Sequence, residues 1–117
     1  MTTTEILIVE DSTTQAAQLS HTLEQAGYMV RVAGNGAEAL QAVRETRPHI
    51  IISDAVMPVM DGYTMCRTIK DDVSLCQIPV ILLTSLSDPQ DVIHGIEAGV
   101  DHYLTKPISG RGAPFQT

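Results

Sequence analysis

The sequence predicts a single α/β domain built on a parallel β-sheet. Short apolar runs of strand length alternate with helix-length segments along the chain. Runs such as Ile6–Val9 and Val80–Leu83 are continuously apolar, which is typical of strands covered by helices on both faces. The 117 residues fit one domain, and 44% apolar residues suffice for a core without disulfides or a structural metal.

The first predicted strand, residues 6–9, is followed by a helix that begins at Ser12. Ser12 and Gln15 have the spacing of a capping box. Gly27 stands where a residue with a positive φ commonly ends a helix. Four apolar residues recur at helical spacing and predict one apolar stripe along this helix: Ala16, Leu19, Leu23 and Ala26.

A second, weaker strand is predicted over residues 29–33. Asn35 has the character of a helix N-cap, and Glu38 stands three residues later. The helix that follows must end near Arg47, because the next residue is Pro48 and the position before a proline disfavours helical geometry.

The remaining elements repeat the alternation of strand and helix. A strand is predicted over residues 50–53, and Asp61 caps the helix after it. Residues 79–83 form the fourth predicted strand, and Asp88 caps a helix that has a proline at its first position and ends at a glycine. A short fifth strand is predicted over residues 102–105.

The composition disfavours several classes of protein. A formal charge of −7 opposes binding to nucleic acid and to anionic membranes. Cys66 and Cys76 lack the spacing of a metal-binding pair, so we interpret them as reduced core thiols. Neither a signal peptide nor a membrane-length apolar run is visible, and a cytoplasmic location is predicted.

Polar or charged residues stand at the end of four of the five predicted strands. The carboxyl ends of parallel strands share one edge of a sheet, so residues distant in sequence should meet there. Three carboxylates packed together repel unless a cation lies among them, and Mg²⁺ prefers such ligands. A carboxylate, a divalent cation, a lysine and a hydroxyl suit phosphoryl transfer. The residues concerned are Glu10, Asp11, Asp54, Thr84, Ser85 and Lys106.

Each of these residues also has a plainer interpretation when taken alone. Asp11 is suited to capping the first helix, and Lys106-Pro107 to a surface turn. A threonine after a strand carries little information. The joint pattern is more specific, because all four chemical classes fall at the same edge of the sheet.

The joint pattern resembles the receiver domains of two-component response regulators. The similar stretches are residues 8–12, 52–62, 80–85 and 98–107, and the resemblance covers about residues 5–108. It implies a flavodoxin-like, doubly wound parallel sheet of five strands in the order 2-1-3-4-5. It also implies a phosphoprotein of a phosphorelay signal transduction system.

The resemblance assigns a role to each acidic residue. Asp54 matches the phosphoacceptor, which forms an aspartyl phosphate. Glu10 and Asp11 match the pair that holds magnesium, and the backbone carbonyl of Val56 matches a further ligand. Mg²⁺ is therefore the implied cofactor.

The resemblance further implies that Thr84 and Lys106 contact the phosphoryl group. Tyr103 matches an aromatic residue that changes rotamer on activation. The resemblance also implies that the surface formed by helix four and strand five switches at the same time. The donor would be a sensor histidine kinase or a histidine phosphotransfer protein. The domain would catalyse only its own phosphorylation and dephosphorylation. In the family, the positions of Val56 and Leu86 tune hydrolysis, and apolar residues there predict slow dephosphorylation.

Three other functions remain open at this point. A receiver-like module that binds proteins without being phosphorylated is the main alternative. A Mg²⁺-dependent aspartyl-phosphate phosphatase would carry a second aspartate where Val56 stands. A flavin-binding module is disfavoured, because an acidic edge is a poor cradle for phosphate.

The C-terminus departs from the family pattern. Receiver domains usually end in a fifth helix, but residues 109–117 contain two glycines and a proline, which oppose a helix. We expect the receiver domain to span residues 1–108, with residues 109–117 as a flexible or non-native tail and the fifth helix missing or truncated. Self-association through the uncovered face would follow. The parent protein could carry a C-terminal effector domain.

Overall fold

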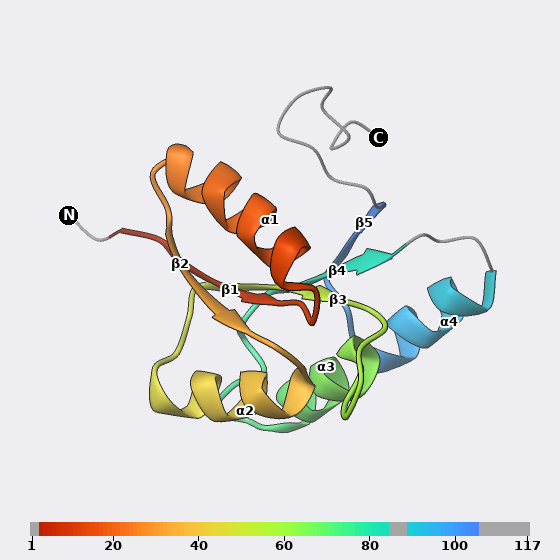
Figure 1. Cartoon of the computed structure of the whole chain (residues 1–117). Coiled ribbons are helices and arrows are strands. Elements are labelled where there is room, and N and C mark those ends of the chain that lie inside the picture. Colours follow the sequence, from red (N-terminus) through yellow and green to blue (C-terminus); the bar gives the residue numbers. More distant parts are fainter. Residues whose placement is uncertain (1–2, 85–88, 106–117) are drawn as a thin grey trace.

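The computed structural model describes residues 3–84 and 89–105, which form a five-stranded sheet flanked by helices (Figure 1). The strand order is β2-β1-β3-β4-β5 and every neighbouring pair is parallel, which confirms the predicted doubly wound fold. The elements are β1 (Glu5–Val9), α1 (Thr13–Gln25), β2 (Met29–Ala33), α2 (Gly36–Glu45), β3 (Ile50–Asp54), α3 (Gly62–Asp71), β4 (Val80–Thr84), α4 (Pro89–Ala98) and β5 (His102–Thr105).

The sheet divides the apolar core into two clusters because successive side chains of a strand point to opposite faces. On β1, Leu7 and Val9 belong to the larger cluster, whereas Ile6 and Ile8 belong to the smaller one. The larger cluster contains side chains of α2, α3 and α4, and the smaller one contains side chains of α1. Figure 1 accordingly shows α1 on one side of the sheet and α2 and α3 on the other.

The first helix follows its prediction except at its end. The Gln15 N–H donates to Ser12 Oγ at 3.2 Å, and Gly27 has a φ of +99°. Ala16 is buried, but Ala26 is exposed because it is the C-cap, where the chain turns toward β2. Leu19 and Leu23 are half-buried against the smaller cluster, so the predicted apolar stripe holds for three of its four residues and is wrong for Ala26.

The caps of the next two helices are confirmed. Glu38 N–H donates to Asn35 Oδ1 at 3.0 Å, and Thr64 N–H donates to Asp61 Oδ1 at 2.8 Å. Both contacts fix the end of a loop that starts at the carboxyl edge of the sheet. The caps therefore determine where the edge loops begin and end.

Several predictions fall outside the described residues: those on Ser85, Leu86, Asp88, Lys106, Pro107 and residues 109–117. Within residues 3–84 and 89–105 the chain forms four helices, α1 to α4. None of these helices is long and apolar enough to cross a membrane.

Candidate functional site

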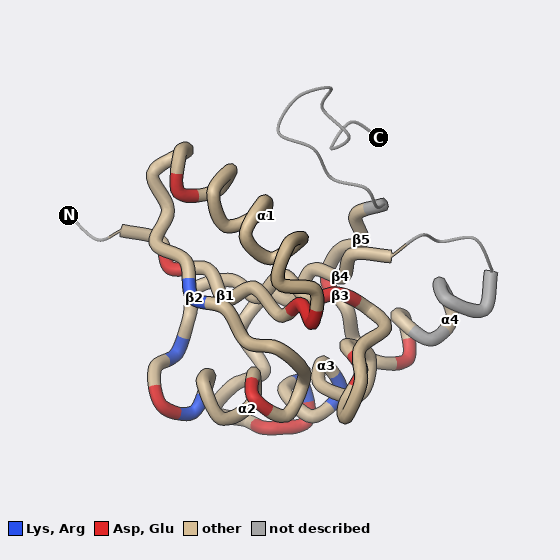
Figure 2. The backbone as a smooth tube through the Cα atoms, viewed as in Figure 1, with Lys and Arg blue, Asp and Glu red and all other residues tan. Residues whose placement is uncertain are grey.

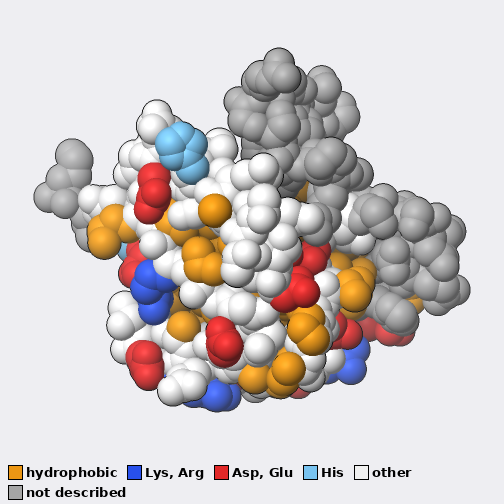
Figure 3. Space-filling view, viewed as in Figure 1, with side chains coloured by type: hydrophobic (Ala, Val, Ile, Leu, Met, Phe, Trp, Pro, Cys, Tyr) orange, Lys and Arg blue, Asp and Glu red, His pale blue; other side chains and the backbone are white. Residues whose placement is uncertain are grey.

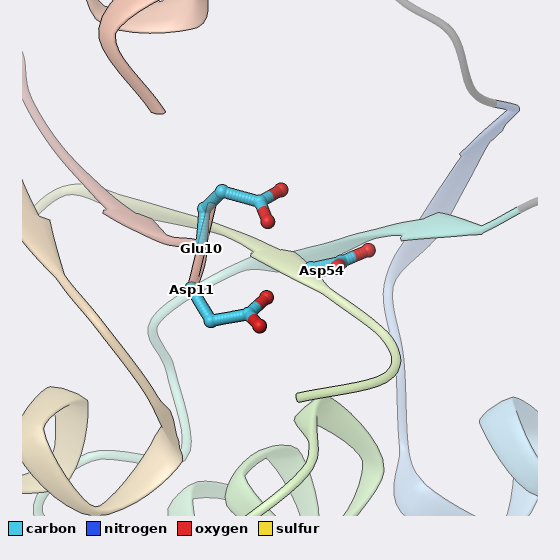
Figure 4. Close-up of side chains that lie close together, drawn as sticks. All are labelled: Glu10, Asp11 and Asp54. Atoms are coloured by element: carbon cyan, nitrogen blue, oxygen red, sulfur yellow. The ribbon is translucent and has the colours of Figure 1, made fainter. Parts of the chain in front are cut away.

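Three carboxylates meet at the carboxyl edge of the sheet (Figure 4). Glu10 and Asp11 follow β1, and Asp54 is the last residue of β3, the strand that pairs with β1. One ligand oxygen from each side chain lies within 4.8 Å of the others. The structure thus brings together the three acidic residues that the sequence predicts at this edge.

The three acids differ in their contact with solvent. Glu10 and Asp54 are buried, with only 6% and 8% of their surface exposed, whereas Asp11 is exposed. The Ser12 N–H donates to Glu10 Oε2 at 3.1 Å, and the Ala55 N–H donates to Asp54 Oδ1 at 3.1 Å. Backbone donors at the starts of the two loops therefore help to orient the buried carboxylates.

Close packing of α3 on the end of β3 fixes the position of Asp54. The Gly62 N–H donates to the Ala55 carbonyl at 2.9 Å, and Ser53 Oγ donates to the Asp54 carbonyl at 2.8 Å. A β-carbon on Gly62 would overlap the Asp54 carbonyl oxygen and lie 3.1 Å from Ser53 Oγ. Only glycine allows the helix to begin so near the site.

The loop between β3 and α3 is fastened to the start of α2. The Gly36 N–H donates to the Met60 carbonyl at 3.0 Å, and a β-carbon on Gly36 would lie 2.8 Å from that oxygen. The Met60 N–H also donates to the Pro58 carbonyl at 2.7 Å, which closes a tight turn around Val59 with a φ of 70°. The loop is thus held at both ends and sharply bent in the middle.

The same loop presents two apolar side chains to solvent. Val56 is 77% exposed and Val59 is 83% exposed. In the space-filling view, hydrophobic and acidic side chains lie close together on this side of the molecule (Figure 3). A partner that approaches Asp54 would meet an apolar rim.

Thr84 and Tyr103 lie on β4 and β5, the two strands that follow β3 in the sheet. Thr84 is the last residue of β4, is buried, and lies one position beyond the residue that pairs with Asp54. Tyr103 on β5 pairs with Leu82 and is half-buried. Lys106 follows the last residue of β5 and lies outside the described residues.

The donor set fits a divalent cation such as Mg²⁺. Ligand oxygens of an octahedral Mg²⁺ lie about 2.1 Å from the metal, and hence roughly 3.0 to 4.2 Å from one another. Carboxylate oxygens within 4.8 Å of one another need only a small rearrangement to reach that geometry. The described Lys and Arg residues lie on β2, α2 and α3 and in the turn after α2, away from this edge (Figure 2).

An ion pair that the sequence analysis did not predict lies near the opposite edge of the sheet, where the strands begin. Lys70 Nζ on α3 lies 2.8 Å from Asp101 Oδ2 and also donates to the Ile78 carbonyl at 2.8 Å. Burial raises the pKa of Asp101, but hydrogen bonds from Lys70 and the Val80 N–H outweigh it and hold that pKa below its usual value. This contact joins α3 to the turn between α4 and β5.

The fold and the site together define a receiver-type phosphorylation domain. The chain belongs to the response regulator receiver domain family, whose model matches residues 6–112. Membership confirms the resemblance inferred from the sequence motifs. Two-component signalling, phosphorylation and Mg²⁺ are typical of this family.

A relative of similar sequence agrees with this assignment. The transcriptional regulatory protein AfsQ1 of Streptomyces coelicolor is 38% identical over 106 residues, which are 91% of this chain and 46% of AfsQ1. The chain therefore spans less than half the length of this relative.

Solved structures give the same result. The signal receiver domain of a signal transduction histidine kinase from Syntrophus aciditrophicus is 53% identical, with a TM-score of 0.87 over 92% of this chain and 81% of that one. The Mn²⁺-bound form of the response regulator Rcp1 is 29% identical, with a TM-score of 0.81 over 89% of this chain and 81% of that one.

Proposed function

We propose that this domain accepts a phosphoryl group on Asp54. The convergence of Glu10, Asp11 and Asp54 at one edge of the sheet carries the proposal. An Asp54 carboxylate oxygen attacks the phosphorus of a phosphohistidine. The P–O bond forms as the P–N bond breaks, and the imidazole nitrogen leaves with the electron pair. The product is an aspartyl phosphate, which water later hydrolyses to inorganic phosphate.

Four groups would hold the metal: the carboxylates of Glu10, Asp11 and Asp54 and the backbone carbonyl of Val56. A bound Mg²⁺ supplies positive charge that neutralises the phosphoryl oxygens. The burial of Glu10 and Asp54 supports this assignment, because buried carboxylates need a compensating positive charge.

Thr84 and Lys106 complete the proposed site. The Thr84 hydroxyl donates a hydrogen bond to a phosphoryl oxygen, and the Lys106 ammonium neutralises a second one. The domain catalyses only its own phosphorylation and dephosphorylation, and it has no other substrate. Its donor is a sensor histidine kinase or a histidine phosphotransfer protein, and the reaction takes place in the cytoplasm.

The output of the proposed modification is a change at the face of α4 and β5. Phosphorylation adds negative charge that Thr84 satisfies by moving toward it, and Tyr103 then changes rotamer. Ile93 and Ile96 on α4 are 44% and 70% exposed, so this face offers apolar surface to a partner. A C-terminal effector domain in the parent protein is one such partner.

A receiver-like module that is not phosphorylated is not favoured as an alternative. Such a module has no need to keep three carboxylates within 4.8 Å of one another, two of them buried. That arrangement carries a desolvation cost that binding to a protein alone does not repay.

We also propose that the domain self-associates through apolar side chains that remain half-exposed on the α1 side of the sheet. Ile50, Ile81 and Leu104 on this face are only half-buried. Sizing by light scattering at several concentrations tests this proposal. A monomer at every concentration would exclude it.

Intact-mass spectrometry tests the proposed phosphorylation. Acetyl phosphate with Mg²⁺ should add one phosphoryl group to the wild-type chain. The adduct should be absent after Asp54→Asn substitution and after addition of EDTA. An adduct that persists under both conditions would contradict the assignment.

A further inference from the structure

Gly95 occupies an unusual place in α4. It lies inside the helix, where glycine is among the least favourable residues, and it is buried. A β-carbon on Gly95 would overlap the hydroxyl oxygen and Cζ of Tyr103 and lie 2.9 Å from its Cε1. The tip of the tyrosine ring therefore occupies the space that any other side chain at this position would fill.

Tyr103 connects α4 to the edge of the sheet that carries the site. It pairs with Leu82 on β4, and Thr84 stands two residues further along β4. Residues two apart on a strand share a face, so Thr84 and Tyr103 are diagonal neighbours on the face that packs against α4. Figure 1 shows the C-terminal end of α4 near α3 and the start of β5. A change at Thr84 can thus reach α4 through a single side chain.

We propose that Gly95 sets the resting rotamer of Tyr103, because it leaves free the space in which the tip of the ring lies, here called the seat. Gly95 thereby biases the domain toward its unphosphorylated state. The inference rests on the proposed function and concerns regulation of the same site. While the ring tip rests on Gly95, Tyr103 keeps the rotamer seen in this structure. When Thr84 moves toward the phosphoryl group, the ring leaves the seat.

Filling the seat should shift this equilibrium. A methyl group at position 95 excludes the ring tip in the resting state and has no such effect once the ring has left. A change that penalises only one of two states shifts the population toward the other and raises affinity for ligands of that other state. Gly95→Ala should therefore tighten binding of beryllofluoride, a phosphoryl mimic, by about fivefold or more, as is typical of coupled sites.

The test has one measurement without ligand and one with it. In the unliganded protein, the NMR shifts of the Tyr103 ring should move in Gly95→Ala toward those of the beryllofluoride-bound wild type. Calorimetric titration with beryllofluoride and Mg²⁺ should show the tighter binding. Glu97→Ala, an exposed substitution in the same helix, should change neither measurement.

A second background keeps the test decisive if Gly95→Ala alone is poorly folded. In Tyr103→Ala the seat is empty, so adding Gly95→Ala should raise the melting temperature and leave beryllofluoride affinity unchanged. An unmoved Tyr103 ring in Gly95→Ala would overturn the inference, as would an equal affinity change in both backgrounds. Failure of the wild type to bind beryllofluoride would instead refute the proposed function, and the unliganded ring shifts would still test the seat.

Discussion

Val59 is the residue at which a single substitution should stabilise the domain most clearly. It is β-branched and has a φ of 70°, a region that such residues rarely adopt. Its side chain is 83% exposed, so removing that side chain loses little packing. Val59→Gly should therefore relieve backbone strain at small cost.

The magnitude follows from two opposing terms. A left-handed backbone costs a residue with a β-carbon about 1–2 kcal/mol, and Val59→Gly removes this cost. Glycine adds conformational freedom to the unfolded chain, which costs about 0.4–1 kcal/mol. With the middle of each range, the free energy of unfolding should rise by about 0.8 kcal/mol. For a domain of 117 residues this corresponds to an increase in melting temperature of roughly 2–4 °C.

Val73→Gly is the matched control. Val73 is 88% exposed, and Val59 is the only described non-glycine residue with a positive φ. The control substitution should lower the free energy of unfolding by about 0.4–1 kcal/mol, because only the unfolded-chain term applies. Urea melts of both variants and the wild type give the comparison. Equal destabilisation by the two substitutions would refute the reasoning about strain.

Three further predictions concern thiol reactivity, acid stability and phosphoryl lifetime. Burial raises the pKa of Cys66 to about 11, so the native protein at pH 8 should show one slow and one faster thiol in a disulfide-exchange assay; equal rates would contradict this. Because the pKa of Asp101 is lowered in the folded state, its contribution to stability is present above its ordinary value of 3.8 and is lost as the pH falls through the lower folded value. Asp101→Asn should remove this contribution, which is less than about 1 kcal/mol because the Asp101 side chain is 39% exposed. Lys70→Met should reduce it, since the hydrogen bond from the Val80 N–H remains. Acid unfolding curves that match the wild type would argue against both expectations. Val56→Asn combined with Leu86→Glu should speed loss of the adduct, as measured by the decay of the phosphorylated mass; an unchanged or slower decay would remove the argument.

The sequence was sufficient to predict the order of elements and the convergence of the acidic residues. The relevant signals are local: Asn35 and Asp61 cap their helices through contacts three residues away, and strands that are apolar throughout imply a covered parallel sheet. The edge of such a sheet then places Asp54 beside the acids that follow β1.

Features that depend on contacts between distant segments could not be predicted in this way. Gly95 appears in the sequence only as a weak helix former, and its role emerges once Tyr103 is seen against it. The contact between Lys70 and Asp101 likewise joins residues 31 positions apart. The left-handed geometry of Val59 had no sequence signal, because valine opposes that geometry.

The central claim is that Asp54 carries the phosphoryl group. The most direct measurement is to phosphorylate the domain with acetyl phosphate and Mg²⁺, reduce the acyl phosphate with borohydride and locate the product by peptide mass spectrometry. Reduction converts a phosphorylated aspartate to homoserine. The account predicts homoserine at position 54 alone, and none when EDTA is present. Homoserine at position 11, or a phosphoryl group that resists borohydride and remains on a serine or threonine, would contradict it.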